Sequence, residues 1–212
     1  FSEGLRITPV RVWRAGVFLH DVAQLLVSNT RAPAQALGDL QAQAEATAVC
    51  EREVLRLVDK YSKATVVAAM QETQDYVERV VLKSLAGMPK GEWETVDYID
   101  GDPALGEGMV PIRIKLTLDG NGIHYDLSGS APAVSTFLNS CYGTTHSAIY
   151  AGTKTFFPDV PLNSGFYRAV TANIGEEGSV VNAGWPHAVS GFCAGPYEKV
   201  MNGIFELWSG VM

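Results

Sequence analysis

The hydrophobic pattern of the chain changes from a helical period to a period of two just after Pro89. Before this point, apolar residues recur every three or four positions, which is typical of amphipathic helices. The pattern predicts a short helix that ends near Ser28, a longer helix from Pro33 towards Lys60, and a third helix that Ser62 caps. We therefore expect residues 1–87 to form a mainly helical, antiparallel unit.

The longer helix carries a stripe of apolar and small side chains along one face. The charged residues Glu51, Arg52, Glu53 and Arg56 fall outside this stripe and are expected to face solvent. The near-heptad spacing predicts that the stripe packs against a neighbouring helix. Its members are Leu37, Leu40, Ala44, Thr47, Val54, Leu57, Val58 and Tyr61.

Gly87 and Pro89 predict the end of the third helix, and after Pro89 the hydrophobic period becomes two, which is typical of strands. Residues 93–99 are predicted to form a strand. Alternating apolar and polar residues then occupy the segment 109–128, with Asp119-Gly-Asn-Gly122 in its middle. Because Gly and Asn tolerate a positive φ, this segment predicts an antiparallel β-hairpin.

The remaining sequence is rich in Gly, Ser and Asn, with helical spacing from Thr144 and again from Pro196 to Met212. A loop and then a strand are expected after Pro158. Residues 88–212 are thus predicted to form an α+β unit. The expected fold class is α+β, with an N-terminal antiparallel helical unit followed by a β-hairpin or sheet, loop-rich segments and further helices. Since the chain starts at Phe1 and stops within an apolar helical pattern, we expect one continuous segment of a larger subunit.

Charge and composition narrow the classes of function. The net charge of −7 argues against a nucleic-acid surface, which requires a basic patch. No apolar run reaches the roughly 18 residues needed to span a bilayer. Cys50, Cys141 and Cys193 lie far apart without a CxxC motif, so they are interpreted as reduced, buried thiols of a cytoplasmic protein.

The most informative polar stretch is Asn29 to Gln43, which joins the first two predicted helices. Asp39 and Gln43 are four residues apart and therefore share one helix face. Gly38 is unfavourable inside a helix, which suggests a close backbone approach there. These polar groups either meet a ligand or partner, or stabilise a helix junction, for example through an ion pair between Arg31 and Asp39.

Other polar residues allow several kinds of chemistry, although no self-sufficient catalytic motif is present. Cys141 lies five residues before His146, and a nearby imidazole can stabilise a thiolate; a buried thiol and a helix-start histidine are the simpler interpretation. His124 and Asp126 share one face of the predicted hairpin, but two ligands are too few for a structural metal site.

Asn139 and Asn163 each lie beside small residues in loop-rich sequence. Asparagine side chains hold loops by bonding to the backbone, so both residues are expected to fix loops or to form the wall of a pocket.

Several blocks together resemble the hydantoinase B/oxoprolinase family, in their order and spacing along almost the whole chain. Ser62 and Ala133 depart from the residues that are common there, and Ala133 removes a glutamine-dependent contact. The blocks that carry the resemblance are EGLRITPV at 3–10, N-x-R-x-P at 29–33, GDLQAQ at 38–43, DLSGS at 126–130, Asn139, and P-x-N-x-G-x-x-R at 161–168.

The resemblance implies a B-type subunit of an ATP-dependent, hetero-oligomeric enzyme. Members open cyclic amides such as hydantoin, 5-oxoproline or lactams through a phosphorylated intermediate, and relatives carboxylate ketones such as acetone or acetophenone. A partner subunit resembling hydantoinase A is expected to carry ATP and Mg²⁺. A divalent metal, where present, is bound N-terminal to the EGLR block, so no metal ligand is assigned to this chain. The isolated chain is expected to be inactive.

The same resemblance makes the polar blocks candidates for substrate binding, while the catalytic residues stay unassigned. One alternative is a subunit of a ketone carboxylase, because both reactions use one scaffold. Another is an assembly surface for the ATP-binding partner, without catalytic residues of its own. The candidate binding residues are Asn29, Arg31, Asp39, Gln43, Asn139, His146, Asn163 and Arg168.

Overall fold

The structure is a computed structural model that describes residues 7–101, 106, 108–190 and 195–212. The start of the EGLRITPV block and Cys193 lie outside these residues. The described chain forms two compact units, which divide between Met70 and Gln71 inside helix α3 (Lys63–Leu85). The predicted helix stop at Gly87 and Pro89 instead follows the end of α3 at Leu85.

The first unit is built around one long helix, and its helices agree closely with the predicted ranges. The short helix α1 packs on α2 and buries Ala23 and Val27. Ala15 and Gly16 both have positive φ and form the turn of a small hairpin before α1. The elements of this unit before α3 are β1 (Trp13–Arg14), β2 (Val17–Phe18), α1 (His20–Val27) and α2 (Pro33–Tyr61).

Helix α2 differs from the prediction in its packing. None of its 29 residues is buried, so the expected apolar stripe stays partly exposed to solvent within the described unit. Ser62 alone joins α2 to α3, with φ of 75°, and its Oγ accepts a hydrogen bond from the Thr65 N–H at 3.4 Å. The predicted cap is therefore confirmed, whereas helix packing in this unit is mainly that of α1 on α2.

The second unit contains a four-stranded sheet in the order β3-β4-β5-β6. The predicted hairpin is confirmed, because β4 and β5 pair antiparallel across the Asp119–Gly122 turn. β6 adds in parallel to β5, which places the segment after Arg168 beside the hairpin. The strands are β3 (Gly91–Ile99), β4 (Val110–Leu118), β5 (Ile123–Asp126) and β6 (Val170–Asn173).

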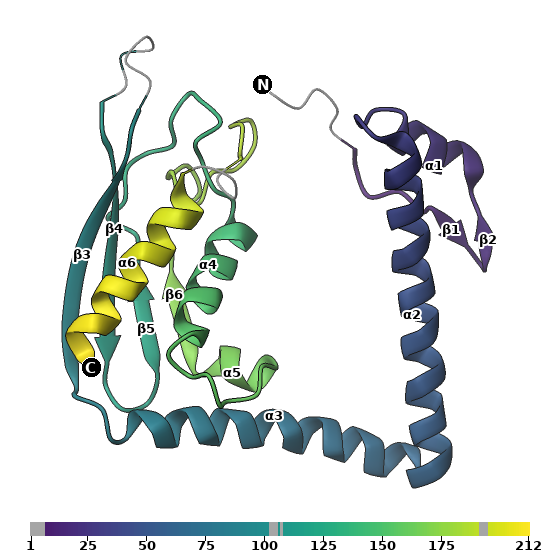
Figure 1. Ribbon diagram of the computed structural model, residues 1–212, viewed down its shortest axis with the longest axis horizontal. Helices are drawn as coiled ribbons and strands as arrows, with labels where there is room; N and C mark the ends of the chain where they lie inside the picture. The colour runs from purple at the N-terminus through teal and green to yellow at the C-terminus, as the bar shows by residue number, and fades with distance from the viewer. Residues whose placement is uncertain (1–6, 102–105, 107, 191–194) are drawn as a thin grey trace. The chain divides into compact units, whose positions relative to one another are not determined.

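Two helices cover one face of this sheet (Figure 1). α6 (Pro196–Val211) packs on β3 and β4, and α4 (Tyr142–Lys154) packs on α6. Gly203 permits the close approach of α6, because a Cβ there would lie 2.7 Å from Ile114 Cδ1. The short helix α5 (Ser164–Arg168) precedes β6, where only a loop was expected before the strand. The fold class is α+β, as predicted.

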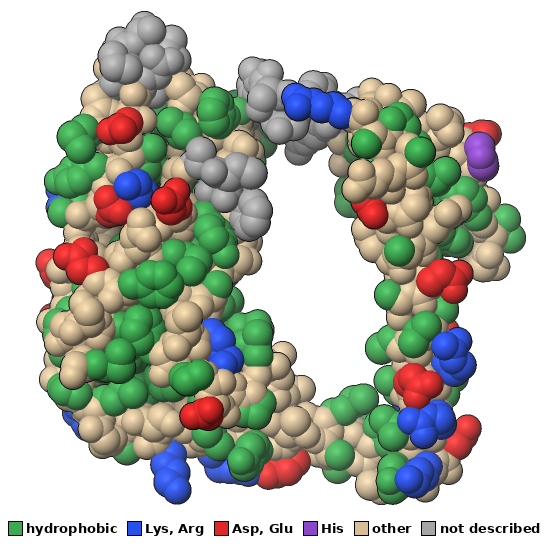
Figure 2. Space-filling view, viewed as in Figure 1, with side chains coloured by type: hydrophobic (Ala, Val, Ile, Leu, Met, Phe, Trp, Pro, Cys, Tyr) green, Lys and Arg blue, Asp and Glu red, His purple; other side chains and the backbone are tan. Residues whose placement is uncertain are grey.

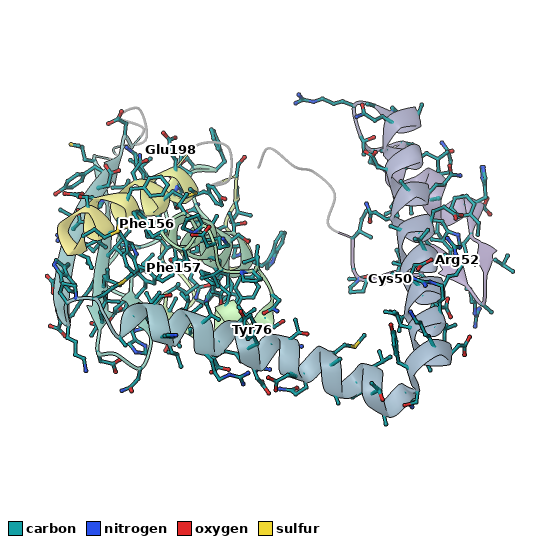
Figure 3. All side chains as sticks on the ribbon, turned by 60° about the horizontal axis from the view of Figure 1, so that its bottom comes forward. Cys50, Arg52, Tyr76, Phe156, Phe157 and Glu198 are labelled. Carbon is teal, nitrogen blue, oxygen red and sulfur yellow. The ribbon has the colours of Figure 1, made fainter. Side chains whose placement is uncertain are left out.

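A chain of hydrogen bonds crosses the core of the second unit. Trp208 Nε1–H donates to the Tyr125 hydroxyl at 2.7 Å, and that hydroxyl lies 2.8 Å from Thr153 Oγ1. Thr153 donates its own proton to the Ile149 carbonyl at 2.6 Å, so Tyr125 must be the donor to Thr153. Burial raises the pKa of Tyr125 to about 12. Phe156 and Phe157 (Figure 3) pack their rings against Trp208 at 5.2 and 5.5 Å.

Among the helices that the structure describes, none combines the length and apolar character needed to cross a membrane.

Candidate functional site

The polar stretch 29–43 lies at the surface of the first unit. Asn29 Nδ2 donates to the Leu25 carbonyl at 2.6 Å and so closes the end of α1. Arg31, Asp39 and Gln43 are exposed, and no hydrogen bond or ion pair joins their side chains to other described residues. These side chains are free to meet something outside the described chain.

Two structural expectations for this stretch are wrong. Among the described residues, nothing lies within 4 Å of the position that a Cβ would take at Gly38, so the expected close backbone approach is not made within this part of the chain. Arg31 and Asp39 form no ion pair, since both belong to the described residues and neither has a charged partner among them. The expectation for Gly38 assumed that another backbone packs against α2, and this packing is not made within the unit.

Asn139 is placed at the centre of a loop network in the second unit. It is fully buried, and its Oδ1 accepts from the Val134 N–H at 2.8 Å. Its Nδ2 donates to the carbonyls of Val134, Thr136 and Ala188 at 2.9 to 3.0 Å. Every polar atom of the amide is used, so Asn139 fixes loops and has no atom left for a ligand.

The block P-x-N-x-G-x-x-R fastens α5 to α3. Asn163 Oδ1 caps α5 by accepting from the Gly165 N–H at 2.8 Å, while its Nδ2 donates to the Thr73 carbonyl at 3.2 Å. A Cβ at Gly165 would lie 1.9 Å from the Gln74 carbonyl oxygen, so only glycine fits. These contacts set α5 directly on the backbone of α3.

Arg168 completes the same attachment through its guanidinium. Nη1 lies 2.7 Å from Asp75 and 3.3 Å from Glu78, and Nη2 donates to Gln74 Oε1 at 2.9 Å. The hydrogen bond from Arg168 lowers the pKa of Asp75 below its ordinary value, and a second from Gln71 adds to this effect. Arg168 therefore has its acceptors within the fold.

His146 has a different environment from the two asparagines. Its Nδ1 lies 3.0 Å from the Tyr142 carbonyl, which can only accept, so Nδ1 carries the proton and the Nε2 lone pair is free when the ring is neutral. The ring stacks on Tyr142 at 4.1 Å and lies 6.0 Å from Tyr150, which contacts Tyr167 at 4.4 Å. We call these four residues the aromatic row.

Cys141 precedes α4 and does not pair with His146. Its Sγ lies 3.3 Å from Thr144 Oγ1. Partial burial raises the pKa of the thiol, but the hydrogen bonds from Thr144 and Gly143 outweigh this, and the pKa is lowered overall. Cys141 is half-buried and Cys50 on α2 is exposed (Figure 3), so the prediction of buried thiols is wrong for Cys50.

The face shared by His124 and Asp126 is occupied by protein contacts. His124 Nδ1 lies 2.7 Å from Thr171 Oγ1, and its Nε2 lies 3.4 Å from Asp119. Asp126 accepts from the Ser128 N–H and from Asn173. Over residues 7–101, 106, 108–190 and 195–212, no group of three or more His, Cys, Asp or Glu could hold a metal ion.

The DLSGS block forms a turn between two surface hollows, of about 420 and 540 Å³. The first is also lined by Arg113, one of the polar residues that alternate with apolar ones along β4 and not a predicted binding residue. The larger hollow is lined by Glu176 and Glu177. Arg113 was missed because its pairing with this turn is not visible in any local pattern, whereas the i, i+4 spacing of Tyr142, His146 and Tyr150 could have revealed the aromatic row.

Known proteins provide an independent comparison. The chain is 35% identical over 187 residues to the beta subunit of a caprolactamase from Pseudomonas jessenii, covering 88% of this chain and 32% of that protein. It is 28% identical to the B subunit of a putative D-/L-hydantoinase from Pseudomonas sp. (strain NS671), covering 88% of this chain and 33% of that one. The chain thus spans about a third of the length of these relatives.

Solved structures agree with this result. The crystal structure of the ATP-dependent caprolactamase from Pseudomonas jessenii matches 100% of this chain and 36% of its own, with a TM-score of 0.87 and 32% identity. A nucleotide-free acetone carboxylase structure matches 89% of this chain and 26% of its own, with a TM-score of 0.71 and 14% identity, which shows a common fold only. The family model for hydantoinase B/oxoprolinase matches residues 1–212, and the chain therefore belongs to the hydantoinase B/oxoprolinase family.

Proposed function

We propose that this chain is part of the B-type subunit of an ATP-dependent enzyme that opens a cyclic amide, with a lactam as the first substrate to test. The observation that supports this most is the similarity to the caprolactamase, which extends over the whole chain at 32% identity. The similarity to acetone carboxylase, at 14% identity, supports no more than a shared scaffold.

ATP would make the amide reactive by phosphorylating its oxygen, on a hydantoinase A-like partner subunit that also holds Mg²⁺. The resulting imidate-like carbon is then open to attack by water. Arg31 suits the binding of the phosphate or of a substrate carboxylate, because a free guanidinium binds paired oxygens through parallel hydrogen bonds. His146 suits proton transfer, because its Nε2 is free and its ring orientation is fixed.

A second candidate function is assembly. Helix α2 has no buried residue, and its exposed side chains include both charges (Figure 2) and apolar residues such as Val49 and Leu55. Such a helix suits a contact with a partner subunit or with further parts of the same subunit. In that case, residues 29–43 serve binding of protein and not of substrate.

One assay distinguishes cyclic-amide hydrolysis from ketone carboxylation. The intact two-subunit complex is given ATP with caprolactam, hydantoin, 5-oxoproline, or acetophenone plus bicarbonate, and substrate-stimulated ADP release is measured. We expect a cyclic amide to stimulate ADP release and the ring-opened product to appear by mass spectrometry. Stimulation by the ketone with bicarbonate alone would replace the hydrolase by a carboxylase, and activity of the isolated chain would contradict both.

The assembly function has its own readout. Amide hydrogen exchange of α2 is compared between the isolated chain and the complex. Strong protection of residues 29–43 by the partner subunit, without a further change on adding substrate, would favour assembly over substrate binding.

A further inference from the structure

The outer face of the sheet in the second unit carries a hollow of mixed charge. Along β4, Ile112 and Ile114 are buried under the helices, so the alternate residues Arg113 and Lys115 project from the opposite face. A hollow of about 420 Å³ lies over this face, within the size range of small-molecule sites. Its charged and turn residues are Glu94, Arg113, Lys115, Asp126, Ser128 and Gly129.

The charge of Lys115 is matched by protein carboxylates, whereas Glu94 and Asp126 both keep acceptor capacity. Lys115 Nζ lies 2.8 Å from Glu92 and 3.9 Å from Glu94. Asp126 Oδ1 accepts from the Ser128 N–H at 2.9 Å and from Asn173 Nδ2 at 3.2 Å. The guanidinium of Arg113, by contrast, has no acceptor anywhere in the part of the chain that the structure describes.

The DLSGS turn holds Arg113 in place without using its charge. The Arg113 N–H donates to Ser130 Oγ at 3.1 Å, and the Ser130 hydroxyl lies 3.3 Å from the Arg113 carbonyl. Gly129 lies along the Arg113 side chain, since a Cβ there would be 3.4 Å from Arg113 Cδ. The backbone of Arg113 is therefore bonded to the turn, and its guanidinium is left for an external acceptor.

We propose that this hollow binds a small amino-acid zwitterion, with its carboxylate on Arg113 and its ammonium group towards Glu94 and Asp126. Two basic and two acidic side chains line the hollow, so it is electrically balanced and suits a ligand with both charges. An inorganic phosphate would gain Arg113 but would be repelled by both carboxylates. A ligand with a single charge would be matched either by the basic or by the acidic side chains, but not by both.

This site is distinct from the proposed reaction residues, and binding to it does not require turnover. Hydrolysis of a lactam yields an amino acid, so the hollow would bind the product class of the reaction. Only this connection between the ligand and the reaction product rests on the proposed function.

The test is calorimetric titration of the complete B-type subunit, without ATP, using ε-aminocaproate. Caproate, hexylamine and inorganic phosphate serve as probes with one kind of charge. We expect ε-aminocaproate to bind at least about tenfold more tightly than any of these, because it alone can form charge-assisted hydrogen bonds with both the basic and the acidic side chains. Equal affinity for phosphate or caproate, or no binding by ε-aminocaproate, overturns the proposal.

Two variants locate the site. Arg113→Gln should weaken ε-aminocaproate at least about tenfold, while the matched control Arg52→Gln on α2 should leave the affinity unchanged. Glu94→Gln should weaken ε-aminocaproate but not caproate, because only the former carries an ammonium group. Unchanged affinity in Arg113→Gln, with the fold verified by circular dichroism, contradicts the assignment even if the complex proves to be a lactam hydrolase.

Discussion

The polar stretch 29–43 of the first unit and the block 161–168 of the second have similar residue types but opposite roles in the structure. In the second, Asn163 and Arg168 direct their hydrogen bonds to α3 and Gly165 touches its backbone. In the first, Arg31 and Gln43 contact no described polar group and Gly38 faces open space. The difference shows that the side chains without internal partners are the ones available for external binding.

The largest loss of stability is expected for a substitution of Asn139, whose side chain is hydrogen-bonded within the protein. Asn139→Ala would leave one backbone N–H and three carbonyls without their partner. The two amide protons are shared among the three carbonyls, so at about 1 kcal/mol for each full bond the free energy of unfolding should fall by about 3 to 4 kcal/mol. Urea unfolding followed by tryptophan fluorescence measures this, and a loss below about 1 kcal/mol would show that water replaces the amide.

Gly165→Ala should be next in size. The new Cβ would collide with the Gln74 carbonyl, which belongs to a helix backbone and cannot move aside cheaply. A loss of about 3 kcal/mol is expected, at the upper end for overpacking. The same urea titration applies, with Gly143→Ala as the matched control because nothing lies within 4 Å of a Cβ there.

Arg31→Ala tests the side chains that have no partner within the described chain. In the assembled enzyme, kcat/KM should fall at least about tenfold, in line with the loss of a hydrogen bond to a charged group. The unfolding midpoint of the chain should not change, because Arg31 has no described partner. Arg52→Ala, an exposed arginine of α2, is the control. A lower midpoint with unchanged kcat/KM would return Arg31 to a structural role.

Gly38→Ala should have a small effect of the opposite sign. Alanine is more favourable than glycine inside a helix, so α2 should gain about 1 kcal/mol. Slower amide exchange along α2 in the isolated chain would confirm this. If the same substitution weakens assembly of the complex, then a partner approaches the helix at Gly38.

The smallest effect is expected for the solvent-exposed pair of Arg168 and Asp75. Because the pKa of Asp75 is lowered in the folded state, the pair stabilises the fold fully above about pH 4 and loses this contribution as the pH falls further. Arg168→Gln should reduce this acid dependence. Urea midpoints between about pH 3 and pH 6 in low and high salt measure it, and an unchanged acid dependence would mean that the pair is screened out.

The helices and strands could be predicted from the sequence more fully than the packing between them. The hairpin, the long helix from Pro33 and the final helix follow from periodicity and turn residues, which are local properties. The exposure of the α2 stripe could not be predicted, since periodicity identifies the apolar face of a helix but not the surface that covers it. The local pattern also could not show that Asn139 is bonded internally while the guanidinium of Arg113 has no acceptor among the described residues. Their environments are set by Ala188 and by Ser130, partners that are distant along the chain.

The indole N–H of Trp208 offers a natural optical and magnetic label at the centre of the second unit. It is buried and hydrogen-bonded to Tyr125, and so its proton should exchange with deuterium only when α6 separates from the sheet. A single resonance in a nuclear magnetic resonance spectrum would then report how often the second unit opens. Followed during binding or assembly, that one proton would reveal whether events at the surface tighten or loosen the centre of the unit.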